Sequence, residues 1–138
     1  DRDTSGILLV AKTQPATSYL GKAMIRRAFA KTYLAVVGNP HNLPDEGVIR
    51  FSLRREEIGR EAYSRVCAAD HPDAQSAETA FTVLARTEEA ALVRCEPHTG
   101  RMHQIRVHLA EMGSPIAGDV RYGAVAGRRV RAAADAAR

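Results

Sequence analysis

Hydrophobic and polar residues follow the patterns of β-strands along much of the chain. Residues 6–11 (GILLVA) form a continuous apolar run after a Thr-Ser-Gly turn, which is typical of a buried strand. Four further segments are rich in β-forming residues or alternate apolar with polar side chains. They predict strands at residues 29–37, 48–53, 77–84 and 90–95, the last two as a hairpin. Residues 54–76 are mostly polar, so we expect an irregular connection with one short strand at residues 63–66.

The segment after the first apolar run has the signals of a helix start. Thr13 can cap a helix that begins near Pro15, because proline is favoured in the first turn of a helix. We expect this helix to run to about Arg27. Its inward-facing positions are expected to include Leu20, Met24 and Ile25.

A second helix is predicted over residues 102–112. Ile105, Leu109 and Met112 recur at i, i+4 and i+7, which places them on one helix face. Gly113 fits the C-terminal cap of this helix. Together the elements predict an α+β fold, in which flanking helices pack on a mixed, mostly antiparallel sheet.

The chain length of 138 residues suits one domain with a real core. We expect this domain to occupy residues 1–123. Residues 124–138 are basic and rich in alanine and arginine, and we expect them to begin a truncated C-terminal segment. Because the chain starts at Asp1 rather than at a methionine, we expect the domain to be a fragment whose N-terminal part is missing.

Composition and charge narrow the class of protein. The net charge of +4 permits an anionic partner, although many basic proteins bind no nucleic acid. No continuous apolar run reaches membrane-spanning length, so we expect no membrane partner. Cys67 and Cys95 lack the spacing of metal ligands, and each is expected to be a small buried residue in a reducing compartment, the cytoplasm.

Two short clusters carry candidate chemistry. Asp1 and Asp3 precede the first apolar run, where they act either as functional carboxylates or simply as acceptors for turn amides. Lys31 and Tyr33 have the same parity in a predicted strand, so they project to one face and can serve a polar cleft. The alternative is a tyrosine packed at the sheet edge, with Lys31 extending its amine to solvent.

The most distinctive cluster is HTGRMHQIRVHL at residues 98–109, where a turn enters the second predicted helix. A helix N-terminus presents free N–H groups and partial positive charge, which suits phosphate. The three histidines are spaced by five residues, so successive side chains are rotated by about 140° on a helix. They cannot share one face, and no His-Glu-x-x-His pattern is present, so we expect no metal site.

Three blocks, DRDTSGILLVAKT, KTYLAVVG and HTGRMHQIRVHLAEMGSPIAGDVRYG, closely resemble the RluA-type RNA pseudouridine synthases in order and spacing. The resemblance covers residues 1–37 and 77–123 and implies the pseudouridine-synthase catalytic fold. The family's first block normally reads His-Arg-Leu-Asp-x-x-Thr-Ser-Gly, so its essential aspartate falls on Asp1. Its active-site tyrosine falls on Tyr33, and the basic partner of the aspartate falls on Arg106. The His-Arg-Leu and the base-displacing arginine of the family are absent from this chain.

The resemblance implies an isomerase that converts uridine to pseudouridine in structured ribosomal or transfer RNA, as a monomer without cofactor or metal. Asp1 would act at the ribose of a flipped nucleotide, Arg106 would keep Asp1 ionised, and Tyr33 would stack on the uracil. The expected RNA-binding residues are Lys31, Arg101, His103 and Gln104. Residues 118–119 and 122–123 resemble family framework and receive no chemical role.

Two other classes of protein remain as alternatives. One is an RNA-binding module that has lost catalysis, and the other is a basic structural domain with no nucleic-acid role. The presence of Asp1, Tyr33 and Arg106 together favours the enzyme, because a pure RNA binder has no need of a carboxylate that faces phosphates.

Overall fold

The computed structural model describes residue 1 and residues 3–123. The basic segment expected at residues 124–138 lies outside the described residues. The chain divides into two units, residues 1–31 and residues 32–138, and each is described by itself.

The first unit contains the helix α1, Gln14–Ile25, as predicted. The side-chain oxygen of Thr13 accepts a hydrogen bond from the Ala16 N–H at 3.3 Å, so the predicted cap is confirmed. Its expected inward face is not buried within this unit, where Met24 and Ile25 are both exposed. The buried strand expected at residues 6–11 is wrong for this structure, because those residues form no strand and Ile7 and Leu8 are exposed. An apolar run becomes a strand only where another strand pairs with it.

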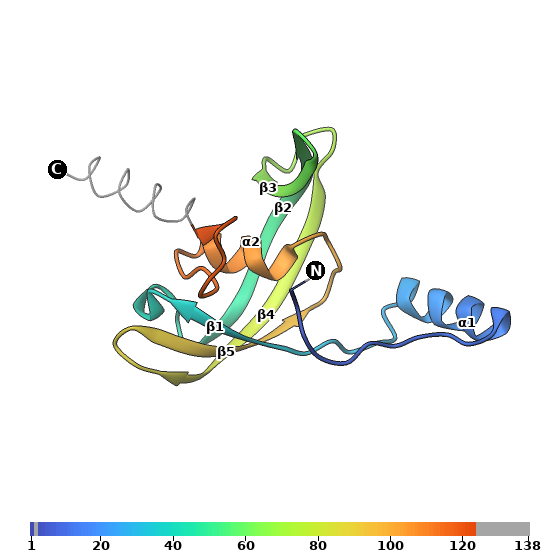
Figure 1. The fold of residues 1–138 in the computed structure, drawn as a ribbon. Coiled ribbons are helices and arrows are strands. Elements are labelled where there is room, and N and C mark those ends of the chain that lie inside the picture. The colour runs from blue at the N-terminus through green and yellow to red at the C-terminus, as the bar shows by residue number, and fades with distance from the viewer. Residues whose placement is uncertain (2, 124–138) are drawn as a thin grey trace. The chain divides into compact units, whose positions relative to one another are not determined.

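The second unit is built on a five-stranded antiparallel sheet (Figure 1), with strand order β1-β5-β4-β2-β3. The strands are β1 Tyr33–Gly38, β2 Glu46–Ile58, β3 Glu61–Cys67, β4 Gln75–Arg86 and β5 Ala90–Pro97. A short 3-10 helix, η1 Pro40–Asn42, joins β1 to β2. The hairpin of β4 and β5 confirms the prediction. The strand expected from residue 29 begins only at Tyr33, so Lys31 precedes it.

The short strand expected at residues 63–66 is confirmed as part of β3, but the irregular connection expected before it is wrong. Instead β2 continues to Ile58, turns, and pairs with β3 along its length. Charged side chains meet on this hairpin. Arg65 of β3 donates across it to the Glu56 carboxylate at 3.0 Å, and Arg54, on the same strand as Glu56, donates to that carboxylate at 3.2 Å. Opposite charges on neighbouring strands stabilise a pair that hydrophobic alternation does not mark.

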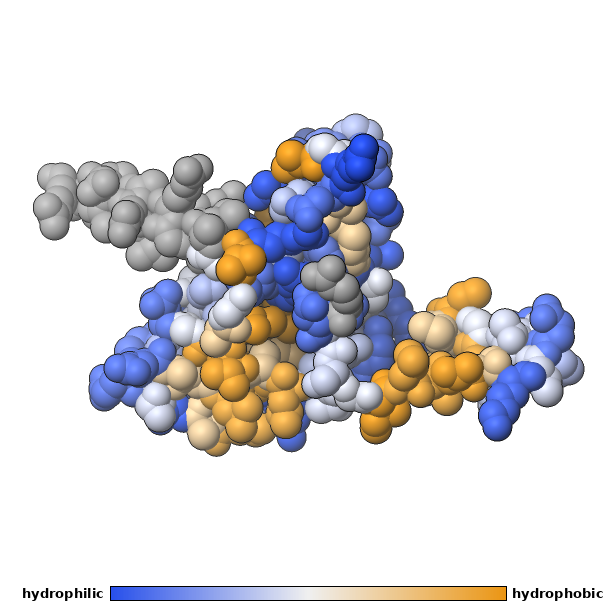
Figure 2. Space-filling model, viewed as in Figure 1, coloured by the Kyte–Doolittle hydropathy of each residue, from blue (hydrophilic) through white to orange (hydrophobic). Residues whose placement is uncertain are grey.

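The core lies between the sheet and the helix α2, Gln104–Glu111. Leu109 is fully buried there, and Ile105 and Met112 pack against the same cluster, as the helical spacing predicts. Alternate residues of β1, Ala35 and Val37, face this core, while Leu34 and Val36 are exposed. Apolar residues gather at the surface over β1 and β5 (Figure 2).

The two cysteines are free thiols in different environments. Cys95 is fully buried, as predicted, and Cys67 is only partly buried. None of the helices in the described part of the chain combines the length and the hydropathy of a membrane span.

Candidate functional site

The turn that leads from β5 into α2 is held by the side chain of Gln104, which is buried. Its carbonyl oxygen accepts hydrogen bonds from the Thr99 hydroxyl at 2.7 Å and from the Arg101 N–H at 3.0 Å. Its amide nitrogen donates to the Glu78 carbonyl and to the Thr79 hydroxyl, both at 2.9 Å. These four bonds use the full hydrogen-bonding capacity of the amide, so Gln104 ties the turn to β4.

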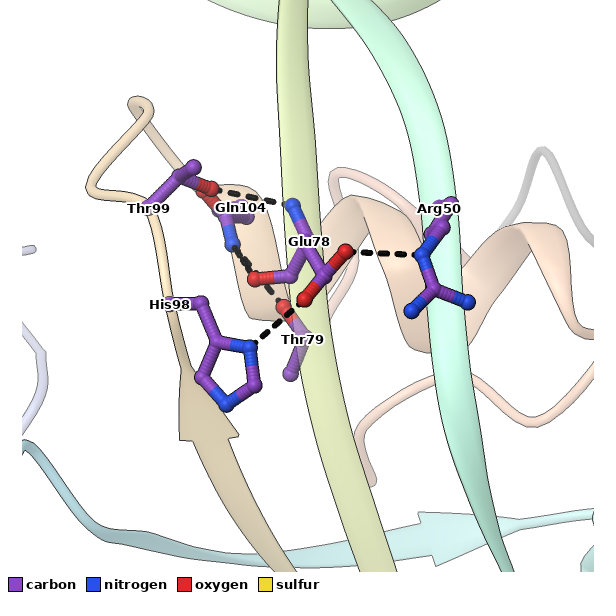
Figure 3. A network of polar contacts seen from close by, with 6 residues as sticks. All are labelled: Arg50, Glu78, Thr79, His98, Thr99 and Gln104. Carbon is purple, nitrogen blue, oxygen red and sulfur yellow. Dashed lines mark hydrogen bonds and ion pairs between the residues drawn. The ribbon is translucent and has the colours of Figure 1, made fainter.

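The outer part of this network is charged (Figure 3). The Glu78 carboxylate accepts from Arg50 Nε at 2.7 Å and lies 2.7 Å from His98 Nδ1. Hydrogen bonds from His98 and from Arg50 hold the pKa of Glu78 below its ordinary value. Arg50 comes from β2, and His98 lies in the turn that follows β5. The network therefore joins β2 and this turn to Glu78 on β4, the strand between β2 and β5 in the sheet.

Arg101, an expected RNA-binding residue, sits on this turn. Its backbone N–H is bound by Gln104, and its side-chain Nε donates to the Ser76 carbonyl at 3.1 Å. The side chain is partly exposed at the surface of the unit. Backbone and side chain of Arg101 are therefore both fixed by neighbouring residues.

Arg106 of α2 makes a bidentate pair with Asp119. The Arg106 Nε lies 2.7 Å from one carboxylate oxygen, and Nη2 lies 3.0 Å from the other. Burial acts to raise the pKa of Asp119, but the Arg106 hydrogen bond and the N–H groups of Tyr122 and Arg121 outweigh it and keep the pKa below its ordinary value. The pair is thus an ionised guanidinium and carboxylate.

Tyr122 packs beneath the same guanidinium. The Cζ atom of Arg106 lies 4.9 Å from the centre of the Tyr122 ring, which is a cation–π contact. The Tyr122 hydroxyl accepts the Ser64 N–H at 2.9 Å and lies 2.7 Å from His103 Nδ1. Burial and the nearby Arg106 lower the pKa of His103, which favours a neutral imidazole; its Nδ1 can then accept a hydrogen bond from the Tyr122 hydroxyl.

Tyr33 is half-exposed at the start of β1. It has the same parity as the core-facing Ala35 and Val37, so it projects from the sheet face on which α2 packs. Tyr33 and Arg106 therefore belong to the same side of the sheet.

The structure places the expected site residues in both units. Asp1 and Lys31 belong to the first, and the second holds Tyr33, Arg101, His103, Gln104 and Arg106. The expected pairing of Asp1 with Arg106 stays a prediction. Because the strand begins at Tyr33, strand parity gives no argument for Lys31.

Asp119 and Tyr122 both contact Arg106, but the sequence assigned neither of them a chemical role. One signal was available for Asp119, which is the only acidic residue between Glu111 and Asp135 in a stretch rich in arginine. An isolated carboxylate among arginines indicates an ion pair, but it does not identify the arginine.

The three histidines around α2 have separate environments. His98 contacts Glu78, His103 contacts Tyr122, and His108 is fully buried with its ring against Phe51. Neither ring nitrogen of His108 has a hydrogen-bond partner within the described residues. Over the same residues, no three His, Cys, Asp or Glu side chains are grouped as metal ligands would be.

Comparison with known proteins gives a consistent family. The sequence profile described as "RNA pseudouridylate synthase" matches residues 1–111. The chain is 40% identical over 125 residues to an uncharacterized RNA pseudouridine synthase, YlyB, of Bacillus subtilis, covering 89% of this chain and 39% of that protein. It is 42% identical over 123 residues to the ribosomal large subunit pseudouridine synthase C of Vibrio cholerae, covering 89% of this chain and 37% of the relative. The chain thus spans about two fifths of the length of these curated relatives.

The solved structures agree. Human RNA pseudouridylate synthase domain containing 1 superposes with a TM-score of 0.79 at 30% identity, covering 95% of this chain and 56% of that one. Human RNA pseudouridylate synthase domain containing 4 gives a TM-score of 0.66 at 28% identity, covering 80% of this chain and 44% of that one.

Proposed function

Because this chain belongs to the RNA pseudouridylate synthase family, we propose that it isomerises uridine to pseudouridine in a structured RNA. The observation that best supports this is the fixed guanidinium of Arg106 on the sheet face that also carries Tyr33. We assign to Arg106 a second role, in which it pairs with the Asp1 carboxylate during the reaction.

Asp1 would act at the ribose of a nucleotide that is flipped out of its stack. It would either attack C1′ or remove the C2′ proton, and both routes require an ionised carboxylate. Desolvation in a closed site would raise the pKa of an aspartate, and a guanidinium beside it opposes that shift. Arg106 would thus keep Asp1 charged near neutral pH.

Tyr33 would stack on the uracil and help remove the C5 proton after the new bond forms. The reaction breaks the N1–C1′ bond, turns the base and rejoins it through C5. Nothing is oxidised and nothing is consumed, so the chemistry itself requires no redox cofactor, and we propose a cofactor-free monomer of the cytoplasm.

Lys31, Arg101 and His103 would contact the RNA backbone or the flipped nucleotide. For Gln104 the buried amide supports a more indirect part in RNA binding, in which it holds the turn that carries Arg101. The relatives named ribosomal large subunit pseudouridine synthase C favour ribosomal RNA as the substrate class, with transfer RNA as the second choice.

The test is release of tritium from ribosomal RNA labelled at uridine C5, measured on the full-length protein. We expect release by the wild type, none by Asp1→Asn, and RNA binding by both. Asp3→Asn is the matched control, since it removes a neighbouring carboxylate that the proposal leaves without a role. Turnover by the Asp1→Asn variant would refute the catalytic assignment. RNA binding without turnover by the wild type would instead favour the alternative, a catalytically inactive RNA-binding module.

A further inference from the structure

We propose that Asp119 is a positioning residue for Arg106, holding its guanidinium in the orientation that pairs with the catalytic carboxylate. This inference rests on the proposed function, in which Arg106 acts on Asp1. Asp119 would not touch the substrate, and its effect on the reaction would pass through Arg106.

The first support is the geometry of the pair. Both carboxylate oxygens of Asp119 accept from the guanidinium, at 2.7 and 3.0 Å, so the plane of the guanidinium is set as well as its position. The Asp119 side chain is 5% exposed, and that of Arg106 is 24% exposed. A buried bidentate pair restricts the arginine far more than a pair at the surface does.

The second support is that contacts other than the one with Arg106 also hold Asp119 in place. Its Oδ1 accepts the backbone N–H groups of Arg121 and Tyr122, at 3.1 and 3.2 Å. The Asp119 backbone is held at both ends, donating to the Ile116 carbonyl and accepting from the Gly123 N–H. The carboxylate is therefore built into a rigid turn, and it can impose its orientation on a longer side chain.

The third support comes from the face of the guanidinium. The Tyr122 ring lies beneath it and is fixed in turn by the Ser64 N–H and by His103. Arg106 is thus held along one edge by Asp119 and over one face by Tyr122. A side chain that is fixed in two directions has little freedom to rotate out of its orientation.

Another ion pair of the unit shows what such a contact looks like without this environment. Arg86 Nη2 lies 3.0 Å from Asp45 Oδ1, but the Asp45 side chain is 95% exposed and contacts the guanidinium through one oxygen. Asp45→Asn is therefore the matched control for a change at Asp119.

The experiment is a double-mutant cycle on the full-length protein, with Asp119→Asn and Arg106→Lys, read out by single-turnover tritium release. Lysine keeps the charge but cannot form the bidentate contact. We expect Asp119→Asn alone to lower the catalytic rate by about 100-fold, because small misplacements of a positioned group have effects of that order. KM for RNA should change by less than about three-fold, Asp119→Glu should restore part of the rate, and Asp45→Asn should change nothing.

In the Arg106→Lys background, Asp119→Asn should lower the rate by no more than about two-fold. A second full loss in that background, or a loss confined to KM, would overturn the inference and leave the proposed function standing. Should Asp119→Asn fail to fold in thermal unfolding, Asp119→Ser enters the same cycle, because its hydroxyl can still accept the turn amides. If the wild type releases no tritium, or Arg106→Met turns over normally, the proposed function fails and this inference fails with it.

Discussion

The Nδ1 atom of His103 lies 2.7 Å from the hydroxyl oxygen of Tyr122, although the two residues are nineteen positions apart. The same oxygen accepts the N–H of Ser64 on β3. One hydroxyl therefore joins the start of α2, the segment that follows it, and the sheet. The contact also places Tyr122 beside both His103 and Arg106, two of the expected site residues.

Replacing Tyr122 with phenylalanine tests this junction. The Ser64 N–H is buried and donates to the Tyr122 hydroxyl, so the change would remove that bond where water cannot easily replace it. We expect Tyr122→Phe to lower the free energy of unfolding by about 2 kcal/mol, measured by urea denaturation. Tyr63→Phe is the control, because its hydroxyl contacts Glu61 at an exposed position, and we expect a change below about 0.5 kcal/mol. Equal effects of the two changes would argue against the junction.

Gln104 provides a second test. Gln104→Ala would leave two donors and two acceptors around the buried amide without their partner. We expect a loss of about 3 kcal/mol in the free energy of unfolding, with faster hydrogen exchange at the Arg101 amide. Thr82→Ala, which removes an exposed contact to Arg94, should be near neutral. An unchanged Arg101 exchange rate would show that the turn does not depend on Gln104.

His108 predicts how stability depends on pH. Burial lowers the pKa of His108 from 6.5 to about 4, so the unfolded chain binds this proton more readily than the folded chain does. The neutral His108 therefore contributes fully to the free energy of unfolding above pH 6.5, and this contribution is lost as the pH falls toward about 4. The shift corresponds to a loss of about 3 kcal/mol over that window.

The measurement is urea denaturation at a series of pH values. His108→Leu, which keeps a similar volume without a titratable group, should flatten the decline between pH 6.5 and about 4. His41→Gln is the control, because the His41 side chain is 63% exposed, and it should leave the decline unchanged. The same slope in the His108→Leu variant would assign the decline to other groups.

Tyr33 tests the proposed chemistry rather than the fold. Tyr33→Phe keeps a ring that can stack on uracil but removes the hydroxyl. We therefore expect RNA binding to be retained and the final proton step at C5 to slow by about 100-fold. Single-turnover tritium release measures that step. Tyr19→Phe, at an exposed position of α1, serves as the control. Unchanged kinetics in Tyr33→Phe would remove the proton role while leaving stacking open.

The sequence by itself determined the family and most of the sheet. Alternation marked β4 and β5, helical spacing placed Leu109 in the core, and Thr13 capped α1 as its position predicted. These features depend on residues close together in the chain, where side-chain periodicity and short-range hydrogen bonds act.

Only the tertiary structure decided the long-range pairings. The charged hairpin of β2 and β3, the binding of Gln104 to β4, and the Arg106–Asp119 pair each depend on where two separate segments meet. The sequence positions of polar side chains do not identify their hydrogen-bond partners, because a carboxylate or an amide can bind any donor that the fold brings near. Family resemblance therefore identified Arg106, whereas its partner Asp119 is identified only by the tertiary structure, in which the segment after α2 lies against the helix.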